Sequence, residues 1–426
     1  MKKLTVQLID IALILLMNIF FLHLSVPIAI ISSLIIYLGI YSFRVYDTQT
    51  MKSYTESLIK TTVGTLISFI LILILYFFLN KYFNRYFFLY NLLFTIIILP
   101  ILHKIEYKIY EKHMPVKNYL VIGKQEEIGH IMQEISEKTL HKIRFTQYIN
   151  PDPTTLEEII KQNGQTTSHI IHGIVITDPE LEKTVKPQIQ NYKEEGMDIE
   201  YLPNMAEKYL NRIPIEVAQK FKEYYEVVFQ KVEEYPSKRF LDIIISTIAL
   251  VILSPVILIL SLIIRIEDGK PVIYTQERIG LNNEKFTMHK FRSMKNNSEN
   301  NNAKFATDEQ DRILKVGKII RPIRLDEILQ FYDILKGDMS FVGPRPEQIK
   351  FVEEYNQLIP FYWARHKLKP GLTGWAQIMY KYSSNLEEVK TKLSYDLYYV
   401  KNRDIFLDVN IIFKTIEAVF WKRGAV

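Results

Sequence analysis

Long apolar stretches fill most of the first 110 residues of this 426-residue sequence. They are Leu4–Leu24, Val26–Phe43, Leu58–Leu79 and Tyr86–Leu102. Each approaches the roughly 20 residues that a helix needs to cross the hydrocarbon core of a bilayer. Most of the flanking Lys and Arg residues fall on one side if both ends of a four-helix bundle face the cytoplasm. We therefore expect residues 1–110 to form a transmembrane region of four helices.

The composition is typical of a membrane protein with soluble parts. Hydrophobic residues make up 48% of the chain, and 53 Lys and Arg residues against 47 Asp and Glu residues give a net charge of +6. This small surplus favours attraction to anionic lipid headgroups in a bilayer and predicts no nucleic-acid partner. The chain contains no Cys, which excludes disulfides, thiolate chemistry and zinc sites of the cysteine type.

A soluble region begins at Lys117. Its strand-like runs, which alternate with helical segments, are Asn118–Gly123, Ile170–Thr177 and Asp198–Leu202. This alternation predicts an open α/β sheet over residues 117–212. Of the glycine loop that a dinucleotide site requires, only Gly123 and Gly129 are present, so a structural or regulatory role is favoured over nucleotide binding.

A charged, aromatic connector over residues 213–236 leads to a fifth apolar run, Ile243–Ile264. Length and composition alone are compatible with a fifth transmembrane helix. Ser254 and Pro255 near its middle favour a kink, because proline removes a backbone donor from the helix.

The stretch Arg321–Pro346 places two adjacent carboxylates in a helical pattern. Apolar residues recur at helical spacing, which predicts an amphipathic helix that begins just after Pro322 and ends at Gly337. Asp326 and Glu327 would lie in its first turn, where the helix N-terminus stabilises an ionised carboxylate and attracts phosphate. Acidic residues are also common there simply because they complement the helix dipole.

Cationic residues accompany this carboxylate pair in the sequence. In Gly343-Pro344-Arg345-Pro346, two prolines fix the backbone around one guanidinium, which suits bidentate recognition of phosphate. Upstream, Lys290 and Arg292 alternate with apolar residues, so in a strand both would project from one face. The pattern suggests neutralisation of a diphosphate, and a solvated strand face is the alternative.

This combination closely resembles the signature of the bacterial polyprenyl-phosphate sugar-1-phosphate transferases, or monotopic phosphoglycosyl transferases. In that family an Asp-Glu dyad is followed by Gly-Asp-Met-Ser-x-Val-Gly-Pro-Arg-Pro, which matches Gly337–Pro346. The resemblance extends over roughly Ser237–Trp421 and includes a further block at His366–Gln377. Arg324 departs from the family pattern, because a Ser or Thr is frequent two residues before the dyad, and this puts a capping hydroxyl in doubt.

The resemblance implies a multi-domain membrane protein: an α-helical transmembrane bundle, an α/β Rossmann-like domain and a mixed, mainly α catalytic domain with a re-entrant membrane helix. The catalytic domain would span residues 237–426. Its re-entrant helix, residues 239–264, would be broken at the Ser-Pro pair, with Lys238 and Arg239 at the lipid headgroups. The chain would lie in the bacterial inner membrane as a multi-pass protein with the catalytic domain on the cytoplasmic face.

The resemblance also implies an activity. Sugar 1-phosphate would pass from a nucleotide-diphosphate sugar, such as a UDP-sugar, to polyprenyl (undecaprenyl) phosphate, with release of UMP, to initiate polysaccharide or glycoconjugate synthesis. Asp326 would form a covalent aspartyl-phosphosugar, and Mg²⁺ would lie beside Asp326 and Glu327. The residues expected to bind phosphate or nucleotide are Lys290, Arg292, Gly343 and Arg345.

Two other classes of protein stay open. A membrane-bound nucleotide-sugar dehydratase would also place a Rossmann domain after four spans, but the glycine loop is incomplete and the only Tyr-x-x-x-Lys match, Tyr332 to Lys336, lies inside the dyad helix. A non-catalytic membrane sensor or scaffold for nucleotide sugars is disfavoured by the intact dyad. A homo-oligomer is compatible with each of these readings.

Overall fold

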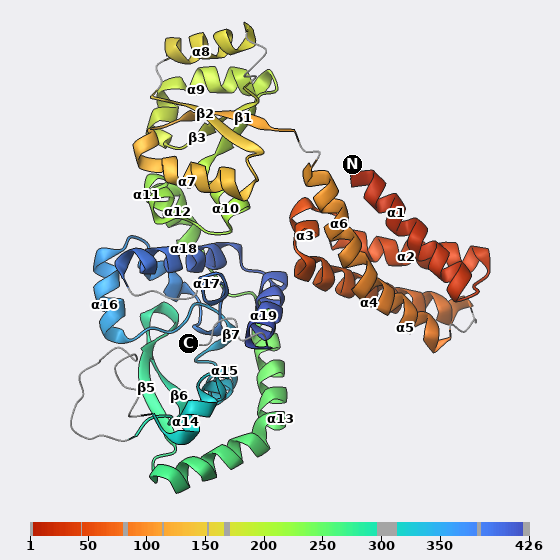
Figure 1. The fold of residues 1–426 in the computed structure, drawn as a ribbon, viewed down its shortest axis with the longest axis vertical. Helices are drawn as coiled ribbons and strands as arrows, with labels where there is room; N and C mark the ends of the chain where they lie inside the picture. Colours follow the sequence, from red (N-terminus) through yellow and green to blue (C-terminus); the bar gives the residue numbers. More distant parts are fainter. Residues whose placement is uncertain are drawn as a thin grey trace. The chain divides into compact units, whose positions relative to one another are not determined.

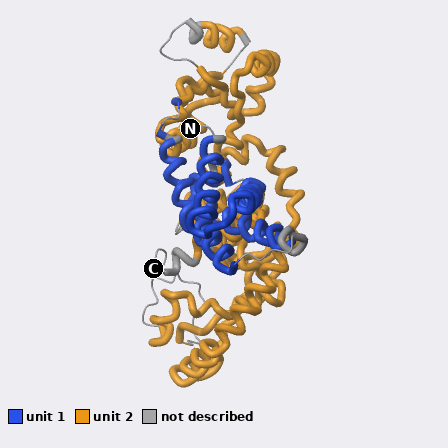
Figure 2. Tube along the Cα trace, turned by 90° about the vertical axis from the view of Figure 1, so that its right-hand side faces the viewer, with its two compact units in different colours: residues 1–115 blue, residues 116–426 orange. Residues whose placement is uncertain are grey.

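A computed structural model describes residues 3–43, 45–79, 84–112, 115–150, 153–165, 171–295, 313–380 and 385–420. The chain divides into two compact units, Met1–Pro115 and Val116–Val426, which are coloured blue and orange in Figure 2. The second unit contains both the α/β sheet and the segments with the Asp-Glu dyad. The domain boundaries expected near residues 212 and 237 therefore stay predictions.

The first unit is entirely helical in its described part (Figure 1). Its elements are α1 (Lys3–Leu16), η1 (Met17–Phe21), α2 (Val26–Ser42), α3 (Thr48–Lys52), α4 (Tyr54–Leu79), α5 (Arg85–Leu93), η2 (Phe94–Ile98) and α6 (Leu99–Lys112). Two helices of this unit, Tyr54–Ile74 and Arg85–Ile109, are long and apolar enough to cross a membrane, whereas Thr5–Phe21 and Val26–Ser42 are shorter apolar helices. Membrane association is therefore supported, and four complete spans stay a prediction.

A chain of buried polar side chains links three helices of this unit. Asp10 Oδ2 lies 2.7 Å from His103 Nε2, and His103 Nδ1 lies 2.8 Å from Ser57 Oγ. All three side chains are fully buried. Such groups are expensive inside an apolar bundle unless they are paired, so the network specifies how α1, α4 and α6 pack together.

The second unit begins with a parallel sheet in the order β2-β1-β3-β4. Its strands are β1 (Lys117–Ile122), β2 (Ile143–Ile149), β3 (Gly173–Ile176) and β4 (Asp198–Tyr201). Figure 1 shows α8 (Pro153–Gln165) and α9 (Pro179–Glu194) on one face, and α7 (Gln125–Lys138) and α10 (Leu202–Leu210) on the other. The predicted open α/β sheet is confirmed, and β2 was missed because its burial alternates irregularly.

The crevice at the carboxyl ends of β1 and β3, where the strand order reverses, contains protein side chains. Thr177 Oγ1 donates to the Ile122 carbonyl at 2.6 Å and lies where a Cβ at Gly123 would be. Lys220 forms ion pairs with Asp178 and with Glu127 in the first turn of α7. An acidic first helical turn opposes phosphate binding, which agrees with the predicted structural or regulatory role.

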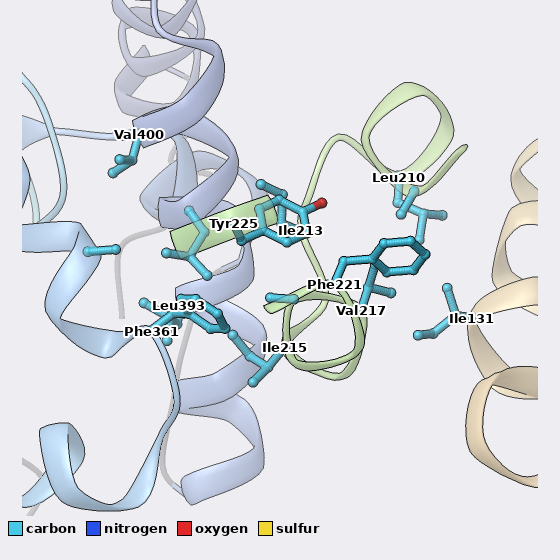
Figure 3. Packing of buried hydrophobic residues seen from close by; sticks show 14 of the residues in the cluster. Ile131, Leu210, Ile213, Ile215, Val217, Phe221, Tyr225, Phe361, Leu393 and Val400 are labelled. Atoms are coloured by element: carbon cyan, nitrogen blue, oxygen red, sulfur yellow. The ribbon is translucent and has the colours of Figure 1, made fainter. Parts of the chain in front are cut away.

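The connector is a buried bridge between the sheet and the remainder of the unit. Its helices are α11 (Ile215–Lys220) and α12 (Lys222–Gln230). Figure 3 shows Val217 and Phe221 near Ile131 of α7, while Tyr225 lies toward Leu393 of α18 (Leu386–Asn402). Since these residues belong to one hydrophobic cluster, the sheet shares a continuous core with the elements between residues 236 and 420, which we call the dyad-bearing part.

The dyad-bearing part is mixed and mainly helical, as predicted. Its strands form an antiparallel hairpin, β5 (Ile273–Ile279) with β6 (Lys285–Phe291), and a short parallel pair, β7 (Ser340–Val342) with β8 (Gly371–Thr373). Its helices are α13 (Pro236–Asp268), α14 (Lys315–Ile320), α15 (Gln330–Lys336), α16 (Ile349–Leu358), η7 (Tyr362–Lys367), α17 (Trp375–Met379), α18 (Leu386–Asn402) and α19 (Ile405–Phe420).

Helix α13 is one continuous helix of 33 residues that bends along its length (Figure 1). The predicted break at Ser254 and Pro255 is wrong: Pro255 lies inside the helix, and Ser254 Oγ donates to the Val251 carbonyl at 2.8 Å. This hydrogen bond gives the residues around the proline an extra tie to the preceding turn, and a proline inside a helix favours a kink. The helix therefore bends without being interrupted.

Both ends of α13 are tied to the same compact unit. Near its start, Asp242 accepts hydrogen bonds from Phe341 N at 2.8 Å and Ser340 Oγ at 3.1 Å. Near its end, Glu267 accepts hydrogen bonds from the first backbone amides of α14. Between the two ends, large apolar side chains such as Val251 and Leu258 are exposed.

The predicted placement of Lys238 at lipid headgroups is wrong, and that of Arg239 stays a prediction. Lys238 is 2% exposed, and its Nζ donates to Asp408 at 2.8 Å, to the Val342 carbonyl at 2.8 Å and to Tyr399 Oη at 3.0 Å. Arg239 donates to carbonyls at the end of α15. These three partners replace the water molecules that would otherwise solvate the ammonium, so the charge of Lys238 is stabilised inside the protein.

Replacement of Lys238 by Met should destabilise the protein by roughly 3–5 kcal/mol, because it leaves Asp408 buried without its cation. The apparent melting temperature of the purified protein in detergent measures the effect. A second substitution, Asp408→Asn, removes that stranded charge and should recover part of the loss. Equal instability of the single and double variants would contradict the assigned ion pair.

Candidate functional site

The Asp-Glu dyad lies in a tight turn rather than in the first turn of an α-helix. Arg324 adopts a left-handed conformation with φ of 55°, and a 3₁₀ turn, η6 (Leu325–Glu327), follows. Helix α15 begins only at Gln330 and ends at Lys336, where Gly337 caps it with a φ of 104°. The predicted helix start is therefore wrong and its end is confirmed. A left-handed residue cannot continue a right-handed helix, so Arg324 separates the dyad from the residues before it, while Ile328 and Leu329 join the 3₁₀ turn to α15.

The two carboxylates of the dyad have different surroundings. Glu327 lies 3.3 Å from Arg324 Nη1 and 3.4 Å from Arg345 Nη2. Burial alone would raise the pKa of Glu327, but the two guanidiniums outweigh it and lower that pKa below its ordinary value. Within the described residues the ion pairs of the dyad are made by Glu327 and not by Asp326.

Asp326 is the more strongly perturbed carboxylate. Burial, followed by repulsion from the charge of Glu327, raises the pKa of Asp326 to about 6. Lys290 opposes this shift. A half-buried carboxylate without an ion-pair partner, facing a lysine, is poised to meet an electrophile or a cation.

Lys290 is brought to the dyad, as predicted. It lies on β6, packs over the ring of Tyr274 on β5 at 5.1 Å, and its charge acts on both carboxylates. Burial, together with the neighbouring charge of Arg278, lowers the pKa of Lys290. Lys290 therefore adds positive charge beside the dyad from the hairpin, while Arg345 adds it from the proline loop.

The proline loop that presents Arg345 is held by a buried arginine. Arg365 Nη2 donates to the Arg345 carbonyl at 2.8 Å and pairs with Asp396 at 3.0 Å. Arg365 is 2% exposed, whereas the Arg345 side chain is 40% exposed. One arginine thus positions the backbone and leaves the other guanidinium available to a ligand.

Gly343, predicted to bind phosphate or nucleotide, has another evident role. Its N–H donates to the Thr373 carbonyl at 2.8 Å. A Cβ there would lie 2.4 Å from the Lys369 carbonyl oxygen. Glycine is therefore required by the close approach of two backbone segments, and its amide already has an acceptor.

Arg292 makes its contacts away from the dyad. It follows β6 directly, is 5% exposed, and its Nη2 donates to the carbonyls of Asp268 and Gly269 at 2.8 and 3.0 Å. Cations are favourable at the C-terminus of a helix, so Arg292 stabilises the end of α13. Its role in phosphate binding stays a prediction that these contacts do not support.

Two further arginines near the dyad were not singled out from the sequence. Arg321 lowers the pKa of Asp326 and has a buried Nη1 without a hydrogen-bond partner among the described residues. Arg278 of β5 interacts with Lys290 and donates to the Pro346 carbonyl at 3.4 Å. Arg321 is the first residue of the sequence stretch that contains the dyad, so the sequence could have indicated it. Arg278 is brought near the dyad only by the pairing of β5 with β6.

The residues around Asp326 fit a magnesium ion in one particular way. No group of three or more His, Asp or Glu side chains gathers within the described parts of the chain, which argues against an all-protein cage. Mg²⁺ commonly takes one or two carboxylates and completes its shell with water and substrate phosphate. The crowded pair Asp326 and Glu327 matches that smaller donor set.

Glu347, just beyond the proline loop, should make the stability of the site depend on pH. Burial would raise its pKa, but Lys392 at 2.7 Å and Arg365 lower it to about 2. Because the folded pKa lies below the unfolded one, the stabilisation is complete above the unfolded value of about 4.3 and is lost as pH falls toward 2.

We expect Glu347→Gln to destabilise the protein by about 1 kcal/mol at pH 7, since a charge-assisted hydrogen bond becomes a neutral one. The difference in melting temperature between variant and parent should shrink as the pH falls below about 4.3. Thermal unfolding in detergent at pH 7 and pH 3 provides the measurement. A difference that is unchanged at low pH would argue against the ion pair.

Comparisons with known proteins identify relatives of the dyad-bearing part. The sequence model of a family described as bacterial sugar transferase matches residues 233–422. A UDP-N-acetylgalactosamine-undecaprenyl-phosphate N-acetylgalactosaminephosphotransferase of Aeromonas hydrophila is 45% identical over 188 residues, which are 44% of this chain and 44% of that protein. A UDP-glucose:undecaprenyl-phosphate glucose-1-phosphate transferase of Escherichia coli K12 is 38% identical over 190 residues, 44% of this chain and 41% of that protein.

A shorter relative decides the family. An uncharacterized sugar transferase of Bacillus subtilis is 35% identical over 187 residues, which are 44% of this chain and 89% of that protein. By contrast, the matched region spans less than half the length of the two named transferases. The chain belongs to the bacterial sugar transferase family.

Proposed function

We propose that this chain transfers sugar 1-phosphate from a UDP-sugar to undecaprenyl phosphate, giving undecaprenyl-diphosphate-sugar and UMP. The observation that carries the proposal is Asp326, a half-buried carboxylate without an ion-pair partner in the described structure, set between Lys290 and the paired Glu327. The names of relatives that match residues around this dyad support the same reaction.

In the proposed first step, an oxygen of Asp326 attacks the phosphorus that bears the sugar. A bond forms between this oxygen and phosphorus, and the bond from phosphorus to the bridging oxygen breaks. UMP leaves with that oxygen and its electron pair, and an aspartyl phosphosugar remains. In the second step an oxygen of undecaprenyl phosphate attacks the same phosphorus, which restores the Asp326 carboxylate and releases the lipid product.

The remaining side chains position the reactants and balance their charge. Phosphoryl transfer depends mainly on these two effects. Lys290 and Arg345 would hold the diphosphate, while Arg345 also keeps Glu327 ionised beside Asp326. Asp326 and Glu327 would hold Mg²⁺, which when bound supplies further neutralisation of phosphate charge.

Helix α13 is proposed to enter and leave the membrane by one leaflet. Its hydropathy and exposed apolar middle suit lipid, while both of its ends contact one compact unit. Contacts of both ends with one compact unit support a path in which the two ends lie on the same side of the bilayer. The catalytic part would then lie on the cytoplasmic face of the bacterial inner membrane, where nucleotide sugars are made.

The absence of cysteine from the sequence makes this arrangement testable. Single cysteines at exposed Ser237, in the first turn of α13, and at exposed Lys270, just after its end, should both react with an impermeant maleimide only from the cytoplasmic side of membrane vesicles. Inverted and right-side-out vesicles supply the two accessible faces. Labelling of the two positions from opposite faces would show a full crossing.

The reaction itself is tested by nucleotide release from purified protein with UDP-sugars, Mg²⁺ and undecaprenyl phosphate. Asp326→Asn should lower lipid-dependent UMP release by at least about 10³-fold, because it removes the nucleophile. Glu353→Gln, which neutralises an exposed carboxylate of α16, should keep full activity. Release of UDP would indicate glycosyl transfer, and no release with any donor would favour the sensor or scaffold.

A further inference from the structure

Arg324, the residue at which this chain departs from the dyad motif, has a backbone conformation that costs free energy. Its φ of 55° and ψ of 26° lie in the left-handed region, which residues other than Gly, Asn and Asp seldom adopt. Such conformations persist where the surrounding structure determines them, and they gather at functional sites. The Arg324 side chain is 49% exposed, so its burial does not account for the conformation.

Two contacts tie Arg324 to Glu327. The Glu327 N–H donates to the Arg324 carbonyl at 3.2 Å, which closes the 3₁₀ turn. Arg324 Nη1 donates to Glu327 Oε2 at 3.3 Å. The backbone and the side chain of this one arginine therefore both hold the second residue of the dyad.

Each carboxylate oxygen of Glu327 faces a guanidinium. Oε2 faces Arg324, and Oε1 faces Arg345 at 3.4 Å. A hard divalent cation would bind the carboxylate through these same oxygens. A cation at Glu327 must therefore displace a guanidinium or lie next to one, and like charges at such short distances repel each other.

The surrounding charge acts in the same direction. The two carboxylates of the dyad are under the influence of four cations, Lys290, Arg321, Arg324 and Arg345. This surplus disfavours a further cation and attracts an anion. The phosphates of a nucleotide reverse the balance, and they also offer the guanidiniums charge-assisted hydrogen bonds in place of those to Glu327.

We propose that Arg324 competes with the divalent cation for Glu327, so that the cation binds tightly only together with the phosphates of the nucleotide donor. The inference rests on the proposed function, from which it takes a divalent cation at the dyad. Arg324 is then a positioning residue, which holds Glu327 until the donor phosphates attract its guanidinium. Because linkage is reciprocal, nucleotide and cation each raise the affinity for the other.

The test titrates the purified full-length protein in detergent with Mn²⁺, a probe that prefers the same oxygen ligands as Mg²⁺, and measures free Mn²⁺ by electron paramagnetic resonance. Arg324→Gly removes the guanidinium and tolerates the positive φ. Without nucleotide it should bind Mn²⁺ about tenfold more tightly than the parent protein, and saturating UMP should shrink this difference. Arg324→Lys keeps the charge and should bind Mn²⁺ as weakly as the parent.

A double-mutant cycle with Glu327→Gln isolates the contact. In the Glu327→Gln background, Arg324→Gly should change the Mn²⁺ affinity by less than about twofold, because the carboxylate for which the two cations compete is gone. The matched control is Lys183→Gln, which removes a cation from another i, i+3 ion pair, that with Glu180 of α9. This control should bind Mn²⁺ like the parent protein.

Equal Mn²⁺ affinities of Arg324→Gly and the parent protein would overturn the competition, and so would the same gain in both backgrounds. Neither result depends on turnover. A parent protein that releases no UMP with any donor would instead overturn the proposed function, so the two failures are distinguishable.

Discussion

The buried ammonium of Lys238 is the interaction on which the geometry of the dyad-bearing part depends. It joins the start of α13 to the end of β7 through the Val342 carbonyl and to α18 and α19 through Tyr399 and Asp408. A buried ion pair adds little net stability, but it fixes the relative positions of its partners, because any shift leaves a charge unpaired. The loop bearing Arg345 follows β7 directly, so the same contact fixes its origin.

Segments that are far apart in the sequence assemble the site around this loop. The hairpin contributes Lys290, the tight turn contributes the dyad, and Arg365 of η7 holds the backbone of Arg345. Two neighbouring carboxylates acquire different electrostatic roles in this setting. Glu327 is paired with two guanidiniums, whereas Asp326 retains a raised pKa and no ion-pair partner in the described structure.

Sequence patterns predicted the parallel sheet, the mainly helical dyad-bearing part and the end of α15 at Gly337, because hydrophobic period and glycine stops are local signals. They did not predict that the dyad lies in a 3₁₀ turn ahead of α15, because residue type does not encode the left-handed Arg324 that precedes this turn. The roles of Lys238 and Arg292 were also missed. Whether a cation faces lipid, a ligand or a buried carboxylate depends on tertiary contacts that periodicity does not contain.

The sequence likewise indicated some of the candidate site residues and not others. The motif groups Asp326, Glu327 and Arg345, and in the structure Arg345 pairs with Glu327 while the charge of Lys290 acts on both carboxylates. Arg292 lies one residue beyond the end of β6 at Phe291, so alternation within the strand does not determine where its side chain lies. Arg278 is brought to the site by the pairing of β5 with β6, which residue type alone does not specify.

The polar chain in the first unit has a consequence for the order of biosynthesis. Asp10 on the first helix is paired with His103, which lies 93 residues later in the chain. A carboxylate near the middle of an isolated helix costs about 2.5–3.5 kcal/mol on insertion into a membrane. If α1 enters a bilayer, Asp10 gains this partner only after α6 has been made, so the contact is completed late in synthesis of the unit.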